Sequence, residues 1–481
     1  MTIKNKYKTI YDPVHGYIKI PLEYCKNIID TRLFQRLRHI DQTSMKSLYP
    51  SGKHDRFTHS LGVFHLCSVA VDNILKNSEF SQIPETQIII LAESIRIAAL
   101  LHDVGHAPFS HTLENLYQIY ADEPLENTLT ALFPNSTFKN DIKNLSPQPH
   151  ELVSSYVSAT SFKDIIELLG GDTEFVARSI IGCKYKPNAG EGGLSELNKL
   201  KNAFMDILSS KIDVDKLDYI LRDTWASGTH NTTIDIERLL GSLKIGEYKG
   251  KYRLVWKANA QSVIGSVIDG RNYLYTWIYN HHKVLYEAEI INRAVMRLEK
   301  NVSKDGDSLL KKMFSLDVFK TRKTYNGVTA YLPCDADFIY LLKADEENNP
   351  YAHEFLARDH RRFPLWKTVA HFKTIYGRKQ KFELYNIVEK RNEIISSFAK
   401  QHDLADDDII VLKTSSKMAS IANDDVLIEI NGQIEELSYL APSYKGEDEA
   451  CPFIYLNKDK AYLKDELIDF IKDYIQPRLI D

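Results

Sequence analysis

The stretch ESIRIAALLHDVGHAPFSH, residues 93–111, begins as an almost uninterrupted apolar segment and ends in a cluster of ionisable side chains. The apolar run over 92–101 predicts a helix that is buried on all sides. Gly105 stops this helix, and Pro108 prevents it from resuming. His102 and Asp103 therefore stand at the edge of an apolar core, where an imidazole and a carboxylate are costly unless a cation compensates them.

Taken alone, a His–Asp pair at a helix end is more often a cap beside solvent than a metal site. This pair is accompanied by further histidines and acids at other points of the chain. They are His59, His106, His111, the pair His150–Glu151, and the aspartates of IDVDKLDYILRD at 213, 215, 218 and 223. Two imidazoles with two carboxylates suit Fe, Mn, Zn or Co and leave positions open for water and substrate.

The pattern along the first 320 residues predicts a mainly helical body with a few strands. We expect a short strand or hairpin over 1–20 around Asp12–Gly16, and a second hairpin over 248–256 with Gly250 in its turn. Helical patterns cover 21–104, 150–181, 197–224 and 258–300, and loops rich in polar residues, Gly or Pro cover 133–149 and 186–196.

The character of the chain changes after about residue 320. Short β-rich segments separated by polar turns follow: GVTAYL (327–332), DFIYLL (337–342), DIIVLK (408–413) and DVLIEI (425–430). The sequence therefore predicts a helical catalytic domain over 1–320 and a smaller mixed α/β region over 321–481.

Composition narrows the possible functions. The net charge of −4 over 481 residues lacks the basic excess of a general nucleic-acid binder, so no nucleic-acid partner is expected. The five scattered cysteines form no CxxC pair, which argues against a disulfide framework and fits a cytoplasmic protein. No apolar run is long enough for a membrane span, and the N-terminus lacks the apolar segment of a signal peptide.

The ordered set His59, His102–Asp103 and Asp215 resembles the H…HD…D signature of the HD superfamily. Several longer blocks resemble, more specifically, the deoxynucleoside triphosphate triphosphohydrolases, both the bacterial dGTPases and the animal SAM-domain-linked dNTPases. These blocks are YDPVHGYI, FQRLRHI, HDRFTHSLGV, LLHDVGHAPFSH, HE and IDVDKLDYILRD. The resemblance runs from about residue 8 to about residue 300, and it implies an HD-type helical core.

The resemblance implies that His59, His102, Asp103 and Asp215 hold a divalent metal ion, which is Mn, Fe, Zn, Co or Mg. It also implies the reaction: water attacks the α-phosphorus of a deoxynucleoside triphosphate, dGTP foremost, and the products are a deoxynucleoside and inorganic tripolyphosphate. We expect Asp213 and Asp218 to be capping or salt-bridge residues, as surface aspartates usually are.

The leaving 5′-oxygen needs a proton, and His111 with Glu114 three residues on is the candidate for supplying it. His106, His150 and Glu151 match the remaining catalytic cluster of the family. For His106 and His150, a role in supporting other site residues is an equally good interpretation.

Substrate contacts follow partly from helical spacing. Lys216, Tyr219 and Asp223 recur on one face of a helix and offer a cation for phosphate, a phenol, and a carboxylate for the 3′-hydroxyl. By resemblance, Arg56 reaches phosphate and Gln42 lies beside the deoxyribose. Arg271, Tyr275 and Tyr279 resemble the stretch that closes over the nucleotide, and Tyr279 would exclude a 2′-hydroxyl; an aromatic core stripe is the alternative for Tyr275.

Many members of the family are activated by a nucleotide bound between subunits. The matching positions in this sequence are Lys8, Asp30, Gln35 and Arg38, with Arg238 and Lys257 at a neighbouring site. A homo-oligomer, dimer or tetramer, is expected on this basis. The sequence departs from the animal enzymes at Asn259, where they carry lysine, and in NHHKV (280–284), which has an extra residue; an Asp30–Arg38 salt bridge within one chain is the alternative.

Two other functions compete with dNTP hydrolysis. Another HD-superfamily phosphohydrolase would act on a cyclic nucleotide, a guanosine alarmone or a nucleoside monophosphate, but the IDVDKLDY block argues against it. A non-enzymatic nucleotide sensor or nucleic-acid-binding protein on the same fold is disfavoured because all four metal ligands are present.

Overall fold

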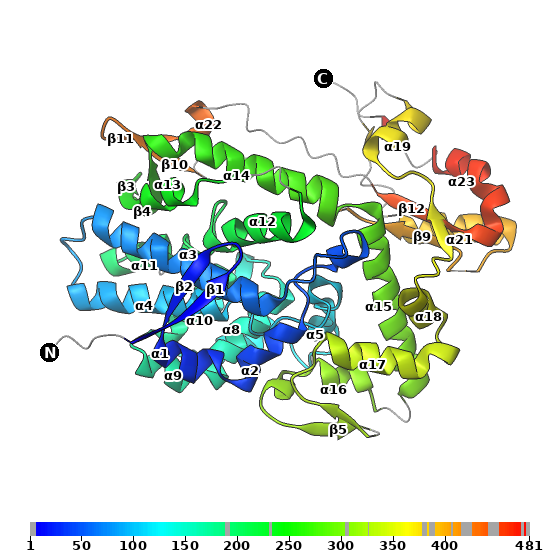
Figure 1. The fold of residues 1–481 in the computed structure, drawn as a ribbon, viewed down its shortest axis with the longest axis horizontal. Helices are drawn as coiled ribbons and strands as arrows, with labels where there is room; N and C mark the ends of the chain where they lie inside the picture. Colours follow the sequence, from blue (N-terminus) through cyan, green and yellow to red (C-terminus); the bar gives the residue numbers. More distant parts are fainter. Residues whose placement is uncertain are drawn as a thin grey trace. The chain divides into compact units, whose positions relative to one another are not determined.

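The computed structural model describes residues 6–187, 193–229, 233–303, 307–325, 327–377, 382–383, 390–405, 407–414, 426–440, 452–472 and 476–477. Over these residues the protein is mainly helical, as predicted (Figure 1). The chain forms two compact units, and the first contains residues 1–272, 302–339 and 419–446. The units interleave along the chain, and a single boundary at residue 320 stays a prediction.

The N-terminal hairpin occupies the predicted place. Strand β1 (Tyr7–Asp12) pairs antiparallel with β2 (Gly16–Pro21). The Asp12 carboxylate accepts the backbone N–H groups of Val14 and His15, which closes the turn. Ile18 and Ile20 of β2 are fully buried, so the hairpin is attached to the core by one face.

Five helices make the core of the first unit: α3 (Arg56–Asn77), α4 (Glu85–Leu101), α8 (Pro149–Ser161), α10 (Thr173–Ile181) and α12 (Val214–Ser227). Helix α3 packs against α4 and α12, and α10 packs against α4 and α8. The predicted buried helix over 92–101 is the C-terminal part of α4, and Leu100 and Leu101 are fully buried.

The turn after α4 is tightly built. His102 is the residue after the last helical position, and its Nδ1 lies 2.8 Å from the carbonyl oxygen of Ala99. A Cβ at Gly105 would lie 2.4 Å from the backbone nitrogen of Ser154, so only glycine lets this turn approach α8 so closely. Phe109 and Ser110 then adopt left-handed φ angles of 54° and 52°.

Shorter elements complete the first unit. Its short helices and turns of helix are α1 (Leu22–Tyr24), η1 (Cys25–Ile29), α2 (Arg32–Gln35), η2 (Arg36–His39), η3 (Ser44–Ser47), η4 (Ser110–Thr112), α5 (Asn115–Ile119), α6 (Leu125–Thr130), α7 (Phe138–Asp141), η5 (Ile142–Asn144), α9 (Lys163–Leu168), α11 (Glu196–Met205), α13 (Ile236–Gly241), η6 (Ala258–Ala260), α16 (Leu309–Met313), η8 (Leu316–Phe319) and α22 (Leu437–Leu440). Helix α14 (Gln261–Leu274) ends at the transition to the second unit, and strands β5 (Lys323–Tyr325) and β6 (Val328–Ala330) form a hairpin.

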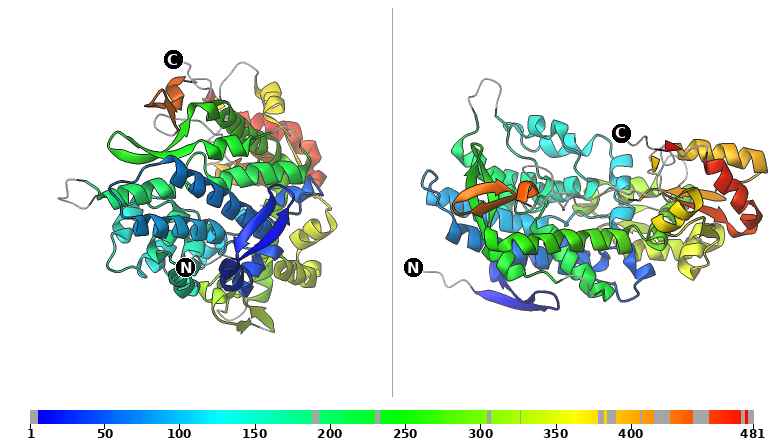
Figure 2. Two further views of the ribbon diagram at one scale, coloured as in Figure 1. Left: turned by 60° about the vertical axis from the view of Figure 1, so that its left-hand side comes forward. Right: turned by 90° about the horizontal axis from the view of Figure 1, so that it is seen from above.

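A sheet of four strands joins distant parts of the chain. The predicted second hairpin is β3 (Leu243–Tyr248) with β4 (Lys251–Lys257), and it turns at Lys249 and Gly250, both with positive φ. Strand β10 (Leu427–Ile430) pairs parallel with β4, and β11 (Gln433–Glu436) completes the order β11-β10-β4-β3. Both views of Figure 2 show these green and orange strands running together.

The second unit comprises residues 273–301, 340–418 and 447–481. Its three-stranded sheet has the order β7-β12-β9, and Trp366, Phe398 and Ile454 are fully buried in its core. Its elements are η7 (Tyr275–Tyr279), α15 (His282–Val302), α17 (Asp335–Asp345, which begins in the first unit), η9 (Glu346–Asn348), α18 (Pro350–Ala357), β7 (Arg362–Pro364), α19 (Val369–Tyr376), β8 (Phe382–Glu383), α21 (Arg391–His402), β9 (Ile409–Leu412), β12 (Phe453–Asn457), η11 (Lys458–Leu463), α23 (Lys464–Ile471) and β13 (Gln476–Pro477).

Some local predictions are wrong. DFIYLL forms helix α17 rather than a strand, because Phe338, Leu341 and Leu342 recur at helical spacing and are all buried. The predicted loop over 133–149 contains α7 and η5, and the predicted helical pattern over 21–104 is interrupted between η3 and α3. Short apolar runs do not distinguish a strand from a helix that buries one face.

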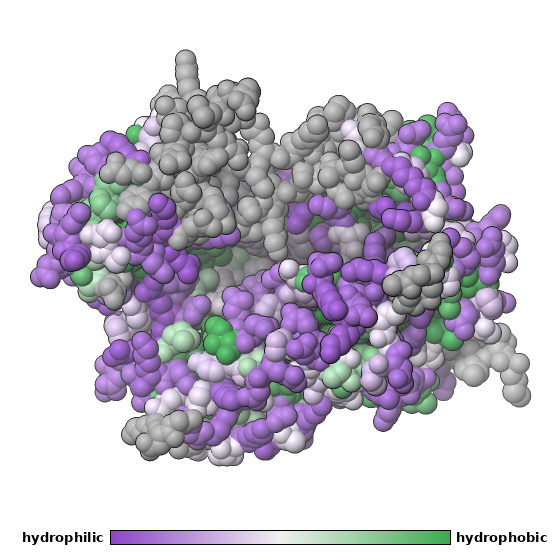
Figure 3. All heavy atoms as spheres, turned by 180° about the vertical axis from the view of Figure 1, so that it is seen from behind, coloured by the Kyte–Doolittle hydropathy of each residue, from purple (hydrophilic) through white to green (hydrophobic). Residues whose placement is uncertain are grey.

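No helix among the described residues is long and apolar enough to cross a membrane. The face of the protein in Figure 3 is largely hydrophilic, and its hydrophobic residues stand in small separate groups among the coloured atoms. Four of the cysteines lie within the described residues, and all four are free thiols: Cys25, Cys67, Cys183 and Cys334.

Candidate metal centre and histidine cluster

Two imidazoles from different helices face one another in the first unit. His59 comes from the first turn of α3 and His102 from the end of α4, and their Nε2 atoms lie 3.2 Å apart. The Nδ1 of His102 donates to the Ala99 carbonyl, which can only accept, and the Nδ1 of His59 lies 2.7 Å from the Asp218 carboxylate. Both Nε2 atoms therefore point to the same place, where a shared proton or a bound cation would keep their lone pairs from repelling one another.

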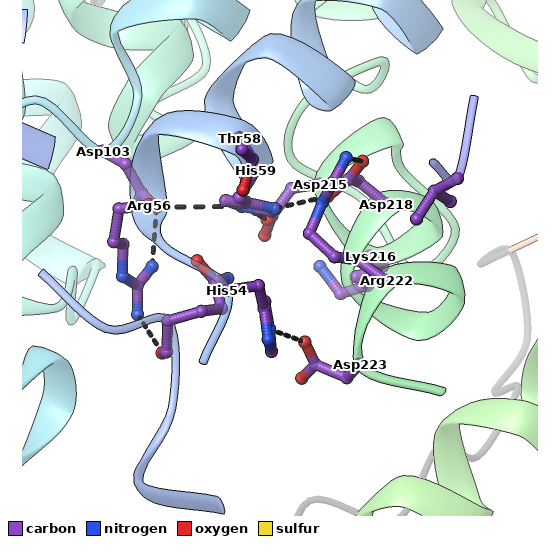
Figure 4. Close-up of polar contacts among 12 residues, drawn as sticks. His54, Arg56, Thr58, His59, Asp103, Asp215, Lys216, Asp218, Arg222 and Asp223 are labelled. Atoms are coloured by element: carbon purple, nitrogen blue, oxygen red, sulfur yellow. Dashed lines mark hydrogen bonds and ion pairs between the residues drawn. The ribbon is translucent and has the colours of Figure 1, made fainter. Parts of the chain in front are cut away.

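Two carboxylates complete this donor set (Figure 4). Asp215 Oδ1, on the first turn of α12, lies 3.0 Å from His59 Nε2 and 3.7 Å from His102 Nε2. The Asp103 carboxylate lies 3.7 Å from His59 Nε2 and 3.6 Å from His102 Nε2. The structure thus brings together all four residues predicted to hold a metal.

The electrostatics of the centre favour positive charge. Burial lowers the pKa of His59, but hydrogen bonds with Asp215 and Asp218 raise it to about 10 overall. Burial raises the pKa of Asp103, but Arg56 and the two histidines hold it well below its usual range. The carboxylates therefore stay ionised, and the donor set fits a divalent cation of the Mn, Fe, Zn, Co or Mg type.

Asp218 holds His59 in place and is itself held from three sides. It accepts from His15 Nε2 at 2.6 Å and from Arg222 at 2.8 and 3.0 Å, and it is fully buried. Arg222 also reaches Asp12 of the hairpin at 2.9 Å. The predicted salt bridge at Asp218 is present, but its contact with His59 Nδ1 was not predicted; the signal for it is the buried helical spacing of Asp215 and Asp218.

Asp213 has the predicted capping role. Its carboxylate accepts the backbone N–H of Lys216 at 2.8 Å as the N-cap of α12. The Lys216 ammonium lies 2.5 Å from the same carboxylate, so in this structure Lys216 is paired within its own helix turn.

A second group of ionisable side chains contains most of the predicted catalytic residues. Glu114 lies between two histidines, with His111 Nδ1 at 3.0 Å and His150 Nδ1 at 2.5 Å. The ring of His106 stacks on His150 with centroids 4.3 Å apart. Burial raises the pKa of Glu114, but both histidines lower it well below its usual range, so Glu114 is a carboxylate that favours protonated neighbours.

His106 differs from the other members of this group. It is fully buried, and neither of its ring nitrogens has a hydrogen-bond partner among the described residues. Burial, followed by the positive charge of Arg56, holds the pKa of His106 well below its usual value. His106 is therefore a neutral imidazole with two unused polar atoms, whereas the side chain of His111 is 60% exposed.

Glu151 has a structural role that the sequence did not reveal. Its side chain accepts the backbone N–H of Gln148 at 2.7 Å and forms a capping box at the start of α8. The predicted catalytic role of Glu151 therefore has a competing explanation in the helix cap.

Arg56 connects the two groups. Its guanidinium donates to Asp103 at 2.6 Å, to Ser110 Oγ at 2.9 Å and to the Gln42 carbonyl at 3.1 Å, and the residue is only 4% exposed. These contacts place Arg56 between the Asp103 carboxylate and the turn before His111. Its predicted contact with phosphate stays a prediction.

The HD domain family matches residues 56–180, from the start of α3 to the end of α10. This segment carries His59, His102 and Asp103 of the candidate centre. It also carries the whole histidine cluster, which is His106, His111, Glu114 and His150.

Residues 56–180 of this chain therefore carry an HD domain.

Curated relatives include the deoxynucleoside triphosphate triphosphohydrolases, as the sequence resemblance indicated. The HD-domain protein is 27% identical over 316 residues to SAMHD1 of Danio rerio, a deoxynucleoside triphosphate triphosphohydrolase, which is 63% of this chain and 46% of the relative. It is 31% identical over 245 residues to the SAMHD1 homolog of Dictyostelium discoideum, 50% of this chain and 40% of the relative. An uncharacterised protein of Mycoplasma pneumoniae is 29% identical over 273 residues, 56% of this chain and 55% of that protein. The chain spans about half the length of the curated relatives it matches.

Solved structures share the fold of the HD-domain protein. A phosphohydrolase from Bacteroides thetaiotaomicron has a TM-score of 0.63 at 20% identity, covering 94% of this chain and all of that one (100%). A hypothetical protein from Aquifex aeolicus has a TM-score of 0.62 at 17% identity, covering 97% of this chain and 100% of that one. The predicted mainly helical HD fold is thus confirmed.

Several predicted substrate residues of the HD-domain protein lie in the first unit. Gln42 is buried, and its Oε1 has no hydrogen-bond partner among the described residues. Arg271 Nε donates to the Tyr219 hydroxyl at 3.2 Å, which joins two predicted substrate residues. Asp223 is fully buried and lies 2.6 Å from His54 Nε2, a partner that the sequence analysis missed (Figure 4).

Tyr275 and Tyr279 belong to the second unit. Their rings meet edge to face with centroids 5.1 Å apart, in the short helix η7. The two rings therefore share one face of η7, and their predicted contacts with nucleotide stay predictions.

The predicted activator residues are distributed over the N-terminal elements of the first unit. Burial is the main cause that raises the pKa of the Cys25 thiol. The charge of Lys8 lowers this pKa, and the charge of Asp30 raises it. Arg38 Nε donates to Gln35 Oε1 at 2.8 Å, and its guanidinium lies 3.5 Å from the centre of the Phe57 ring. Within the described residues, no ion pair joins Asp30 to Arg38.

The two residues of the neighbouring predicted site are exposed. Arg238 pairs with Asp235 at 3.3 Å, and the Lys257 ammonium donates to Asn77 Oδ1 at 3.1 Å. These are surface contacts that a bound anion could replace at low cost.

Proposed function

We propose that this HD-domain protein is a metal-dependent phosphohydrolase that cleaves deoxynucleoside triphosphates, with dGTP preferred, into a deoxynucleoside and inorganic tripolyphosphate. One observation carries the proposal: the facing Nε2 atoms of His59 and His102, with Asp103 and Asp215, stand beside a separate group of histidines around Glu114. Relatives named deoxynucleoside triphosphate triphosphohydrolases support this choice of substrate.

His59, His102, Asp103 and Asp215 would hold the cation. When bound, it would polarise a phosphoryl oxygen and make water a better nucleophile. The protein's part is to keep both imidazoles correctly turned, which the Asp218 carboxylate and the Ala99 carbonyl do through Nδ1.

The histidine cluster handles the proton of the leaving group. The attacking water loses a proton to the surrounding water as its oxygen forms a bond to the α-phosphorus. The bond from phosphorus to the 5′-oxygen breaks, and His111 gives that oxygen a proton, which the ring regains from solvent. Glu114 supports this role, because its carboxylate lies 3.0 Å from His111 Nδ1 and stabilises the protonated ring. The exposure of the His111 side chain, 60%, leaves it accessible to a substrate.

We assign recognition of the sugar and phosphates to the substrate residues predicted from the sequence. Gln42 Oε1 is a buried acceptor without a partner among the described residues, as expected of an atom that receives a ligand hydrogen bond. Lys216, Tyr219, Arg271 and Arg56 supply cations and a phenol for phosphate, and Asp223 accepts from the 3′-hydroxyl. By resemblance to the family, Tyr275 and Tyr279 are further candidates for contact with the nucleotide.

We further propose activation by a nucleotide at an interface between subunits of a dimer or tetramer. Lys8 and Arg38 would hold the phosphates, Asp30 and Gln35 would read a base edge, and Arg238 and Lys257 would serve the neighbouring site. Lys8, Asp30 and Arg38 are exposed, so they are accessible to a ligand.

Product analysis tests the proposal. The metal-loaded protein is incubated with each of the four dNTPs and with GTP, alone and with every other nucleotide as activator, and the products are separated by anion-exchange chromatography. We expect tripolyphosphate and deoxynucleoside, faster from dGTP than from GTP.

The alternative, another HD-superfamily phosphohydrolase, would give phosphate or pyrophosphate, or would act only on cyclic nucleotides or monophosphates. Product that forms equally in His102→Ala protein would show a contaminating activity. No product from any of the four dNTPs, with metal bound, would contradict the proposed hydrolysis of deoxynucleoside triphosphates.

A further inference from the structure

We propose that Asp335 is a positioning residue for the histidine cluster: its carboxylate holds the left-handed turn at Phe109–Ser110 against the segment at Asp41–Gln42. The catalytic part of this inference rests on the proposed function. Asp335 lies beyond the predicted domain boundary at 320, yet it belongs to the first unit, as do the segments it contacts.

Each oxygen of Asp335 accepts a hydrogen bond from a different segment. Oδ1 accepts the backbone N–H of Phe109 at 2.7 Å, and Oδ2 accepts the backbone N–H of Asp41 at 3.0 Å. Asp335 is 6% exposed, so these bonds form away from bulk water, where a lost partner is costly. One carboxylate therefore joins the turn before His111 to the residue before Gln42.

The turn at Phe109 needs such a restraint. Phe109 and Ser110 are consecutive non-glycine residues with φ angles of 54° and 52°, a conformation that L-residues avoid. Strained backbone of this kind persists only where the surroundings determine it, and it gathers at functional sites. His111 follows directly, so the direction of its ring depends on this turn.

The hydroxyl of Ser110 extends the restraint to the metal centre. It donates to the Asp41 carbonyl at 2.5 Å and accepts from Arg56 Nε at 2.9 Å. Arg56 in turn holds Asp103 at 2.6 Å. A shift of the Phe109–Ser110 turn would therefore move His111 and loosen the guanidinium that orients Asp103.

A second contact fixes the segment that carries Asp335. Arg36 is 4% exposed and donates through Nε to the Pro333 carbonyl at 2.7 Å. Its other nitrogens donate to the carbonyls of His106 at 2.5 Å and Val104 at 3.3 Å. The segment 333–335 is thus attached to the turn after α4 at both ends, through Arg36 and through Asp335 itself.

The substitution Asp335→Asn tests the positioning role while leaving the side-chain volume nearly unchanged. The amide keeps the shape but offers only one acceptor oxygen to two N–H donors, so one of the two segments loses its attachment. Asp337→Asn is the matched control, because Asp337 is exposed and lies in the same first turn of α17. Its carboxylate contacts Cys334, whose backbone N–H it accepts at 2.8 Å and whose thiol it also bonds, rather than the segments at Phe109 and Asp41.

Two measurements test the proposal on the full-length, metal-loaded protein. Hydrogen exchange is followed in peptides covering 38–46 and 104–114, and steady-state kinetics are measured with dGTP. We expect Asp335→Asn to exchange faster in at least one of these peptides and to lose about tenfold or more in kcat, with KM and metal content within about twofold. Asp337→Asn should match the wild type in both.

Unchanged exchange in both peptides of Asp335→Asn would overturn the proposal, as would an equal change in Asp337→Asn. If the wild type hydrolyses no nucleotide, the proposed function fails, while hydrogen exchange still decides the role of Asp335. If Asp335→Asn does not fold, Arg36→Lys opens the same attachment at Pro333 and His106. Normal exchange over 104–114 in that variant would likewise contradict the proposal.

Discussion

The Nε2 atoms of His59 and His102 lie 3.2 Å apart, and each ring is turned by an acceptor at its Nδ1. Two lone pairs at this distance repel one another unless a proton or a metal cation lies between them. This relationship joins α3 to α4 and makes the two rings candidate ligands of one metal ion.

His102→Ala should abolish nucleotide hydrolysis, by about a thousandfold or more, and reduce bound metal to trace levels, because one of four donors is removed. Metal content is measured by inductively coupled plasma mass spectrometry and turnover by product chromatography. His353→Ala is the control, since that ring is 57% exposed and pairs only with Glu346 among the ion pairs described. Full metal occupancy in His102→Ala would refute the ligand assignment.

Asp218→Asn should weaken metal affinity by about 10- to 100-fold, because the residue turns His59 toward the centre without touching the metal. Affinity is measured by competition with a chelator of known strength. Asp12→Asn is the control, since it disturbs the same Arg222 guanidinium and leaves the His59 contact in place. Equal losses of affinity in both variants would show that Asp218 acts through general stability alone.

Gly62→Ala should lower the free energy of unfolding by about 1–3 kcal/mol and weaken metal binding. A Cβ at Gly62 would lie 1.9 Å from Asp218 Oδ1 and 2.6 Å from Arg222 Nη2, and both of these side chains are buried. Gly241→Ala is the matched control, because nothing lies within 4 Å of its Cβ position and a helical alanine is favoured by about 1 kcal/mol. Urea denaturation measures both variants, and a Gly62→Ala protein as stable as the wild type would contradict the packing described.

The activity should fall as pH drops through about 6. Burial raises the pKa of Asp335 to about 6 against the backbone N–H groups of Phe109 and Asp41, with the Asp41 carboxylate raising it and Lys46 lowering it. Below that pH the protonated carboxyl can no longer accept both N–H groups. The pH–rate profile of Asp335→Asn should lack this fall in activity near pH 6.

As pH falls, the contribution of Asp335 to the free energy of unfolding should rise, whereas the activity should fall. Because the folded chain binds the Asp335 proton at a higher pH than the unfolded chain, this residue makes the free energy of unfolding rise as pH falls from about 6 to about 4, by ~1 kcal/mol per pH unit. The difference between wild type and Asp335→Asn in urea denaturation isolates that slope from other carboxylates. A difference independent of pH would contradict the raised pKa.

Arg38→Ala should weaken activation by nucleotide while leaving metal content unchanged, if the proposed activator site is correct. Wild-type rates should rise sigmoidally with nucleotide, and the midpoint should shift upward by about fivefold or more in the variant. Lys26→Ala is the control, a nearby cation whose side chain is 64% exposed. Hyperbolic kinetics with every nucleotide pair, and an oligomeric state that nucleotides do not alter in light scattering, would contradict the site.

The sequence alone predicted the HD fold and the ligand set. The apolar run ending at Leu101 could only be a buried helix, so His102 and Asp103 had to stand at the end of a core element, and His59 and Asp215 followed from the resemblance. The sequence also located the turns of both hairpins, at Asp12–Gly16 and at Gly250, but the second hairpin begins at Leu243, five residues before the predicted start at 248.

The tertiary structure alone decided which polar groups orient the candidate metal ligands and the turn before His111. Asp218, His15 and Asp335 meet their partners across 159, 203 and 226 residues of sequence, respectively. No local sequence pattern encodes such pairings. The sequence around a carboxylate at a helix start is the same whether that carboxylate faces solvent or a distant backbone N–H. Helical periodicity determines which side chains share a face, whereas the packing of α3, α4 and α12 and of the segment at 333–335 determines what that face meets.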